Sequence, residues 1–402
     1  MPFQNFCAVV GYSVVSLVFV CAVLEAMLWA LWSLWGLLHP SQVDKLLTNS
    51  PPYAGYPWAR EFWKEEQEAW FKGTEEYVPF RIWGVGSRNG KYVNNDSTEM
   101  GIVRRTINPT GGRCEVGPAL NVWVFGGSTV YGLGVPDWAT LPSYLSERLN
   151  ADLPECIKVT NLGVQGYVVN QEMLLLIDEL KAGHRPNLAV FYDGLNDGLV
   201  GTVSPGFPTA HMEFDQIRAR VEDRMGVKLS FLNHTYTMKT VKAVLRRLRG
   251  PERASLPPGE MAARAKATLG NYEATLAVIR ALAAIYHFDV DFFWQPCLFY
   301  GNKPLDPFER WVIEFTNRES VALWQQGLNA VYQEAEVRSA ASGSFIFLGN
   351  MFDSVNKPLY IGDALHLGPR GNQIVAETIA RELEAPLGAC TKGTSESRGQ
   401  RH

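Results

Sequence analysis

Four short polar segments in this sequence carry groups suited to acyl-transfer chemistry. Ser128 follows two glycines directly after the strand-like run from Asn121 to Phe125. The other three segments contain Gly166, Asn196, and Asp363 with His366. A hydroxyl, an imidazole with a carboxylate three residues before it, and amide donors are the groups that a serine nucleophile requires. The set as a whole therefore predicts acyl transfer through a serine.

Each of these residues has a defined role in such a site. Ser128 is predicted to attack a carbonyl carbon while His366 takes its proton, and Asp363 is predicted to hold the imidazole in the required tautomer. The backbone N–H groups of Ser128 and Gly166 and the side-chain amide of Asn196 are predicted to donate to the oxyanion. Gly-Gly-Ser alone would equally fit an ordinary turn between a strand and a helix.

His366 is the histidine best placed to act as the base. It follows the last predicted strand, whereas Ser128 follows the first. The other six lie beside the apolar N-terminal segment, in the C-terminal tail, before strands at the opposite edge of the sheet, or in an insertion without an aspartate in a nearby turn: His39, His402, His184, His287, His211 and His234.

The order of apolar segments predicts the elements that position these side chains. Short strands alternate with helices after residue 121, which is typical of an α/β fold with a parallel sheet covered on both faces. Ligands of such sheets bind at the carboxyl ends of the strands, where the polar segments fall. The predicted strands are 121–125, 157–161, 188–192, 289–294 and 344–348, and the predicted helices are 141–150, 169–182, 261–286, 309–339 and 371–387.

The N-terminal segment, residues 1–40, predicts a single transmembrane anchor. Residues 6–38 are almost all apolar, with Glu25 as the one charged residue, and about 20 apolar residues span a bilayer. Trp29, Trp32 and Trp35 are typical of an aromatic belt at the membrane surface. A cleaved signal peptide is the alternative, but the segment lacks a basic start and a small-residue cleavage site before Glu25.

The rest of the chain is predicted to have three parts. Residues 41–118 form a juxtamembrane linker and a small β-rich appendage, residues 119–388 the catalytic domain, and residues 389–402 a disordered tail. Within the catalytic domain, residues 199–270 interrupt the alternation and are predicted to form an insertion over or beside the site. Its basic helical run from Lys239 to Arg249 fits either a solvated face or docking on anionic lipid.

Composition limits the classes of function. The chain is 47% apolar and 19% charged, which is globular composition, and its net charge of −4 gives no reason to expect nucleic acid as a partner. The six cysteines include no C-x-x-C pair and no Cys/His cluster, so no zinc site is expected. Cys114 and Cys156 fall at the same, non-catalytic edge of the predicted sheet. They are either free thiols or a disulfide, and a disulfide would indicate an oxidising compartment.

These features resemble the SGNH (GDSL-like) serine hydrolase superfamily. Its four signature residues would be Ser128, Gly166, Asn196 and His366, with Asp363 completing the triad. The resemblance covers residues 121–387 and implies a three-layer flavodoxin-like fold with a five-stranded parallel sheet in the order 2-1-3-4-5. It also implies hydrolysis of esters without a metal or cofactor.

One position departs from the family pattern, because the family's Gly-Asp-Ser becomes Gly126-Gly127-Ser128 here. That aspartate is not a triad member, so the predicted mechanism stands for a divergent member. In membrane-anchored relatives the catalytic domain faces outward, which implies a single-pass membrane protein with an extracytoplasmic catalytic domain. The few basic residues after the apolar segment, taken alone, favour the cytoplasm. The implied substrates are small-molecule, lipid or carbohydrate esters.

Two alternatives to hydrolysis remain open. An O-acyltransferase would form the same acyl-enzyme and pass the acyl group to a polysaccharide hydroxyl, and water exclusion by the insertion would favour it. A non-catalytic polysaccharide-assembly scaffold would keep the fold and bind glycan through its tryptophans, but it has no need of Asp363 beside His366. A nucleotide-binding or flavin-binding domain is not favoured, because no Gly-x-Gly-x-x-Gly follows the first strand.

Overall fold

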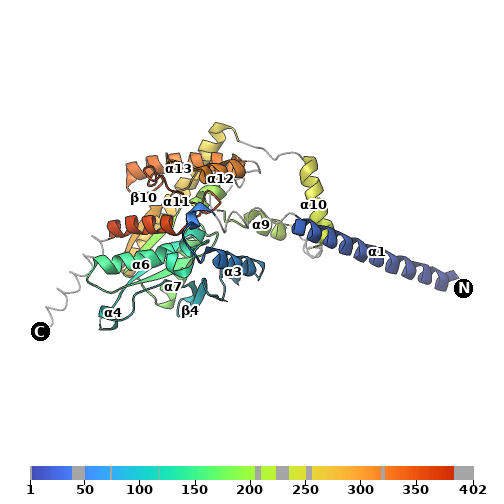
Figure 1. Cartoon of the computed structure of the whole chain (residues 1–402), viewed down its shortest axis with the longest axis horizontal. Helices are drawn as coiled ribbons and strands as arrows, with labels where there is room; N and C mark the ends of the chain where they lie inside the picture. The colour runs from blue at the N-terminus through green and yellow to red at the C-terminus, as the bar shows by residue number, and fades with distance from the viewer. Residues whose placement is uncertain are drawn as a thin grey trace. The chain divides into compact units, whose positions relative to one another are not determined.

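The computed structural model describes residues 2–38, 50–72, 75–116, 118–203, 210–222, 235–249, 256–317 and 322–383 (Figure 1). The chain divides into two units. The first joins residues 1–45 to residues 213–253, and the second joins residues 46–212 to residues 254–402. All the predicted site residues lie in the second unit, which we call the catalytic unit.

The catalytic unit is built on an eight-stranded sheet with five parallel strands. Counted along the chain, the parallel strands lie in the order 2-1-3-4-5, which confirms the predicted fold class. The third of them is buried at every position, as expected for a strand covered on both faces. They are β6 (Leu120–Gly126), β7 (Ile157–Gly163), β8 (Leu188–Asp193), β9 (Asp289–Trp294) and β10 (Ile346–Phe347).

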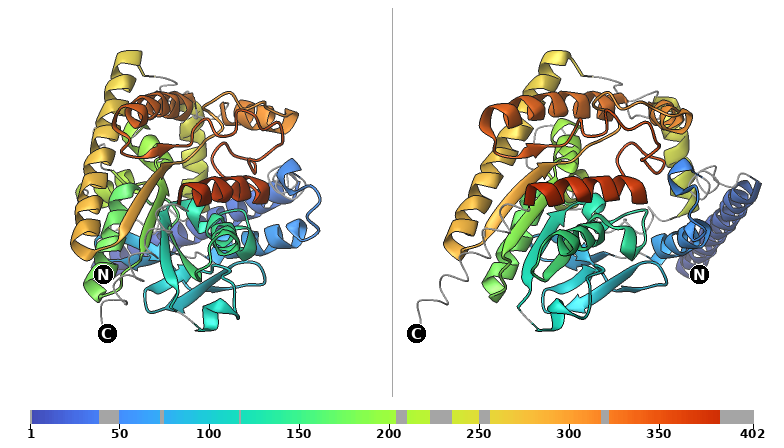
Figure 2. Two further views of the ribbon diagram at one scale, coloured as in Figure 1. Left: turned by 90° about the vertical axis from the view of Figure 1, so that its left-hand side faces the viewer. Right: turned by 60° about the vertical axis from the view of Figure 1, so that its left-hand side comes forward.

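Helices cover both faces of this sheet, as right-handed crossovers between parallel strands require. The helices α7, α8, α11 and α13 pack on one another, whereas α6 packs on β7. Figure 2 shows α11 and the last helix, drawn in red, beside the sheet. The bounds are α6 (Leu141–Asp152), α7 (Val169–Ala182), α8 (Leu195–Val203), α11 (Pro258–Tyr286), α12 (Pro307–Asn317), α13 (Ala322–Ser342) and 369–383 for the last helix. The helix predicted over 309–339 falls on α12 and α13, and residues 318–321 lie outside the described residues.

Three antiparallel strands extend the sheet beyond β7. They are β5 (Gly101–Arg104), which pairs with β7, then β4 (Asn94–Thr98) and β3 (Arg88–Asn89). The segment predicted as a β-rich appendage therefore contributes strands to the central sheet, which has eight strands where the sequence predicted five. An edge strand leaves N–H and C=O groups unpaired, and β5 pairs with part of the β7 edge.

A buried ion pair joins these added strands to the short helix α5 (Ser128–Tyr131) and the loop after it. Arg104 Nη2 lies 3.0 Å from Asp137 Oδ1 and donates to the Val135 carbonyl at 3.0 Å. The guanidinium also lies over the Tyr131 ring, 5.0 Å from its centroid. Removing one partner of a buried ion pair typically costs about 3–5 kcal/mol. The segment before the parallel sheet is thus fixed to the Ser128 side of the site.

Two tryptophans of the segment before the sheet lie in an aromatic cluster. Trp63 is buried and contacts Phe62, and Trp58 contacts Tyr92 and Trp138 edge-on or tilted. This cluster packs around α3 (Ala59–Lys72) and the single turn η1 (Pro51–Tyr53). Trp63 is therefore a core residue and offers no open surface for a sugar ring.

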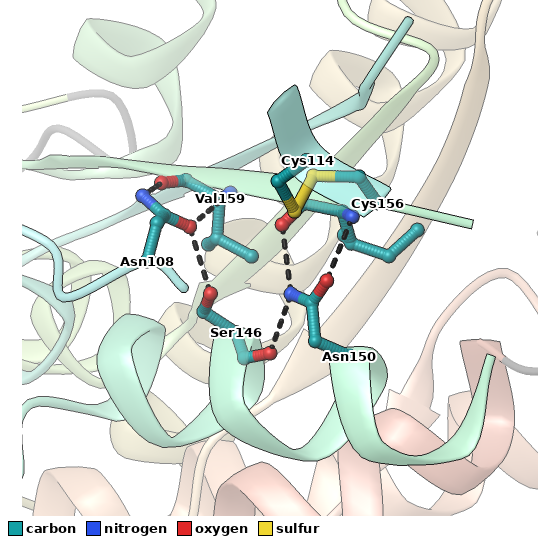
Figure 3. Close-up of a disulfide and its surroundings, with 7 residues drawn as sticks. Asn108, Cys114, Ser146, Asn150, Cys156 and Val159 are labelled. Atoms are coloured by element: carbon teal, nitrogen blue, oxygen red, sulfur yellow. Dashed lines mark hydrogen bonds between the residues drawn. A yellow bond between two sulfur atoms is a disulfide. The ribbon is translucent and has the colours of Figure 1, made fainter. Parts of the chain in front are cut away.

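Cys114 and Cys156 form a disulfide, which is one of the two alternatives that the sequence left open (Figure 3). Cys114 lies in the short helix α4 (Arg113–Val116), and Cys156 directly precedes β7. Beside the disulfide, Asn150 Nδ2 donates to the Ile157 carbonyl at 2.8 Å, and Ile157 N donates back to Asn150 Oδ1 at 3.0 Å. The disulfide lies at the edge where the parallel strands begin, away from their carboxyl ends.

The first unit contains α1 (Pro2–Leu38), α9 (Phe214–Glu222) and α10 (Tyr236–Arg249). Residues 15–34 of α1 form a helix long and apolar enough to cross a membrane, although a signal sequence near an N-terminus would have the same length and composition. The basic run predicted to be helical lies in α10. Residues 204–209, 223–234 and 250–255 of the predicted insertion, and the predicted tail, lie outside the described residues.

Candidate active site

Ser128 is the first residue of α5 and follows β6 by a single residue. The turn is possible because of Gly126, where an added Cβ would come within 2.4 Å of the Tyr192 carbonyl and of a Val130 methyl group. Only a residue without a side chain fits so close to its neighbours. The turn holds Ser128 at the carboxyl end of the parallel strands.

The imidazole of His366 lies between Ser128 and Asp363. Its Nε2 is 2.7 Å from Ser128 Oγ, and its Nδ1 is 2.8 Å from Asp363 Oδ2. The other carboxylate oxygen of Asp363 accepts from the backbone N–H groups of Leu365 at 2.8 Å and His366 at 2.7 Å. The bonds at both ends of the ring fix its orientation, so that Nε2 faces the serine hydroxyl.

The charges of this pair support each other. Burial opposes the charged form of His366, but the Asp363 charge and hydrogen bond outweigh burial and raise the pKa of His366 above its ordinary value. Burial likewise opposes the carboxylate, but the interactions with His366 and the two backbone N–H groups lower the pKa of Asp363. Asp363 therefore stays ionised when His366 takes up a proton.

Asn196 lies in the first turn of α8, with its amide directed toward the residue before Ser128. Asn196 Nδ2 donates to the Tyr167 carbonyl at 2.7 Å. The same nitrogen is only 2.4 Å from the position that a Cβ on Gly127 would occupy. This contact gives a physical reason for Gly127, because an aspartate there would displace the amide.

Gly166 lies in the loop between β7 and α7 with φ of +74°, in the left-handed region that favours glycine. Space is not the constraint at this position. A Cβ would be 3.5 Å from both Trp83 and Met212, which is ordinary van der Waals contact. Glycine is therefore favoured here by the backbone conformation of the loop and not by lack of space.

The Gly166 loop is held from outside by β2 (Ile82–Val85), which forms a hairpin with β1 (Glu75–Val78). Trp83 Nε1 donates to the Gln165 carbonyl at 2.8 Å. The Tyr167 hydroxyl donates to the Trp83 carbonyl, and the two rings pack edge to face with centroids 5.8 Å apart. The residues on both sides of Gly166 are thus bonded to Trp83.

This role of Trp83 was not predicted from the sequence. The residue lies in the segment predicted as an appendage, 82 positions before its partner Gln165. A tryptophan in a short β-rich run carries no pattern that points to a loop so far along the chain. The available signal was chemical: a tryptophan tends to be buried, and its indole N–H then needs a hydrogen-bond acceptor.

A second bond connects the two loops of this side of the site. The Asp197 carboxylate, next to Asn196, accepts from the Val169 N–H at 3.2 Å, at the first residue of α7. Asp197 is buried, and burial together with the neighbouring Asp193 raises the pKa of its carboxyl group well above the ordinary value. Through the bond to Val169, the Asn196 turn and the helix that follows the Gly166 loop are fixed to each other.

No protein-family model matches this sequence, and no curated protein matches it. Among solved structures, the chain is similar to the acetyl xylan esterase AlAXEase, with 15% identity, 66% of this chain and 100% of that chain covered, and a TM-score of 0.35. It is also similar to a lipase/acylhydrolase from Enterococcus faecalis, with 13% identity, 66% and 96% coverage, and a TM-score of 0.35. An acetylxylan esterase from Geobacillus stearothermophilus gives 18% identity, 67% and 95% coverage, and a TM-score of 0.35.

Other similar structures are lipolytic proteins of the G-D-S-L family, at 11–12% identity. At such low identity these similarities concern the fold alone and assign no role to any residue. The chain's own geometry brings Ser128, His366 and Asp363 into hydrogen-bond contact at the carboxyl edge of the sheet. Gly166 and Asn196 lie in the turns that follow β7 and β8 at the same edge.

Proposed function

We propose that the protein is a serine esterase that hydrolyses a carboxylic ester through an acyl-enzyme. The observation that carries this proposal is the Ser128 Oγ to His366 Nε2 distance of 2.7 Å, with the ring held by Asp363 at 2.8 Å. As Ser128 attacks the carbonyl carbon, His366 takes the hydroxyl proton and then gives it to the departing alcohol. In the second half, water attacks the acyl carbon, His366 takes a proton from it, and the acid leaves as Ser128 regains its proton.

The negative oxygen that develops on the carbonyl needs donors on the opposite side from His366. We assign these to the backbone N–H groups of Ser128 and Gly166 and to the Asn196 amide. An amide NH₂ has two N–H groups, and the bond to the Tyr167 carbonyl uses one of them. The second N–H of Asn196 is proposed to face the oxyanion, where losing one donor typically costs about 10²–10³ in rate.

Fluorophosphonate labelling of the full chain in detergent micelles tests the esterase proposal. The wild type should label, and Ser128→Ala and His366→Ala should not, because the probe reacts only with an activated serine. Ser97→Ala, at an exposed serine of β4, is the matched control and should label like wild type. A folded wild-type protein that fails to label would contradict the proposal and favour the scaffold alternative.

The acceptor of the acyl group separates the esterase from the acyltransferase alternative. With p-nitrophenyl acetate and an added oligosaccharide, the esterase releases acetate and leaves the oligosaccharide unchanged. If acetylated oligosaccharide appeared in the product, the acyltransferase alternative would replace the esterase as the proposed function. The substrate class we propose is a small-molecule, lipid or carbohydrate ester.

We also propose that α1 anchors the protein in a membrane with the catalytic unit on the extracytoplasmic side. The Cys114–Cys156 disulfide supports this side, since disulfides form and persist in oxidising compartments and are rare in the cytosol. An alkaline phosphatase reporter fused after His402 should be active, because that reporter folds only outside the cytoplasm. An inactive but intact fusion would overturn the proposed topology.

A further inference from the structure

Glu25 is the only charged residue in the apolar part of α1, and it has partners in α10. The backbone N–H groups of Tyr236 and Thr237 donate to its carboxylate, the latter at 2.9 Å, and the Thr237 hydroxyl donates at 2.8 Å. The first N–H groups of a helix lack partners within the helix, and a carboxylate there also complements the helix dipole. Glu25 therefore caps the N-terminus of α10.

A second contact lies seven residues, about two turns, further along α1. Trp32 Nε1 donates to Thr240 Oγ1 at 3.1 Å, and Lys239 Nζ lies 4.6 Å from the Trp32 ring centroid. Figure 1 shows α10 crossing the C-terminal part of α1. The uncharged run of α1 from residue 6 to Leu24 is by itself about long enough to span a bilayer. With that run as the span, α10 meets α1 at its end, where the tryptophan belt is predicted to lie.

Beyond its contacts with α1, α10 exposes an apolar stripe. Val241, Val244 and Leu245 recur at helical spacing and are 41%, 49% and 42% exposed. Lys239 and Lys242 are exposed as well and fall on a different side of the helix. An apolar stripe flanked by basic residues is typical of a helix that lies in the plane of a membrane surface.

We propose that α10 is an interfacial helix that binds the anionic surface of the membrane crossed by α1. In this arrangement the valine and leucine side chains enter the boundary between headgroups and acyl chains, and Lys239 and Lys242 approach lipid phosphates. The partner is a lipid surface because Glu25 and Trp32 hold α10 at the membrane level. The proposal goes beyond the esterase activity and rests only on the proposed anchoring by α1.

The consequence concerns the catalytic unit, because residues 213–253 interrupt it in the sequence. With α10 on the membrane, the catalytic unit is tethered before residue 46 and again on both sides of this segment. All three connections of the catalytic unit then lead to segments that we propose to be bound to the membrane. Such an arrangement suits an ester substrate that is itself carried at or near that surface.

Spin labels on the full chain in lipid nanodiscs test the position of α10. Labels are placed at Val244→Cys, on the apolar side, and at Lys242→Cys, with Cys7, Cys21 and Cys390 replaced by serine. In discs containing phosphatidylglycerol, the label at 244 should be more accessible to oxygen than to a water-soluble nickel chelate, and the label at 242 the reverse. Val278→Cys, at an exposed valine of α11, is the matched control and should be accessible to nickel.

The lipid charge provides the second arm. Each basic residue near an anionic surface contributes about a fivefold gain in binding, so Lys239→Gln with Lys242→Gln should weaken docking about 30-fold and move the label at 244 toward water. In discs of phosphatidylcholine alone, docking should also be weaker and the label at 244 should likewise move toward water.

Three results would overturn the proposal. A label at 244 shielded from both reagents would mean that this side packs on protein, and a label open to nickel in anionic discs would mean that it faces water. Equal immersion in neutral and anionic discs would exclude anionic lipid as the partner. Fluorophosphonate labelling of the same discs reports the esterase activity separately, so the two proposals can fail independently.

Discussion

The two sides of the Ser128 site are held together in different ways. On the proton-transfer side, Asp363 and His366 are three residues apart in one turn, and backbone N–H groups of that same turn fix the carboxylate. On the oxyanion side, the Gly166 loop is bonded to Trp83, 82 positions before Gln165. One side is thus a local motif, and the other depends on a distant strand. The comparison suggests that local chemistry and remote positioning can be disrupted separately.

The largest effect is expected from breaking the local side. Asp363→Asn keeps the shape of the side chain but removes the charge that holds and stabilises the imidazolium, so kcat should fall about 10⁴-fold. Hydrolysis of p-nitrophenyl acetate measures this change. Asp353→Asn, at an aspartate whose carboxylate accepts from Asn302 in a surface loop, is the matched control and should retain activity. Full activity of Asp363→Asn would remove this residue from the mechanism.

A smaller effect is expected from the contact between Gly127 and Asn196. The Cβ of Gly127→Ala would lie 2.4 Å from Asn196 Nδ2, so the amide must move and kcat should fall about 10²-fold with little change in KM. Gly127→Asp, which restores the residue of the family motif, should be no more active. Gly259→Ala, where a Cβ meets no atom within 4 Å, should behave like wild type. A fully active Gly127→Ala would mean that the Asn196 amide is not required where it lies.

The remote side is tested by removing one hydrogen bond at a time. Trp83→Phe keeps an aromatic ring but loses the donor to Gln165, and a hydrogen bond contributes about 0.5–1.5 kcal/mol, so kcat should fall up to about tenfold. Tyr167→Phe removes the other bond and should act similarly. Trp324→Phe, at a partly exposed tryptophan of α13, is the control. If KM rose while kcat stayed constant, Trp83 would serve substrate binding and not the oxyanion.

The smallest expected effect is a shift in the pH dependence of activity, and it should differ between the two sides of the site. The base must be neutral to accept a proton, and the pKa of His366 is raised, so activity should be lost as pH falls through a midpoint above the ordinary value of about 6.5. Asp363→Asn should lower this midpoint, because the opposing charge is gone and burial remains. Trp83→Phe should leave it unchanged. The rate of fluorophosphonate labelling as a function of pH measures all three, and a wild-type midpoint below the ordinary value would contradict this account.

Much of the fold could be predicted from the sequence because its signals are local. The strand from 289 to 294 and the helix from 169 to 182 have the predicted bounds, since continuous apolar runs and helical periodicity mark buried strands and amphipathic helices directly. The strand order followed from the resemblance. The three added strands were not predicted to join the sheet, because short polar strands such as β4 do not specify which edge they pair with.

The sequence by itself determined which residues could do the chemistry. A serine after two glycines, and an aspartate three residues before a histidine, keep their chemical meaning wherever the chain takes them, because the spacing within each motif is short. It also determined that one apolar segment near the N-terminus is long enough to cross a membrane, since length and composition alone set that property.

Only the tertiary structure decided how these pieces meet. In the folded chain Cys114 forms a disulfide with Cys156, and Trp83 is hydrogen-bonded to the Gly166 loop. The Asn196 amide packs against Gly127, and Glu25 caps the N-terminus of α10. Each of these contacts joins segments distant in sequence. Their formation depends on sheet pairing and packing of the whole unit, and the free energy of such contacts is not encoded in either segment alone.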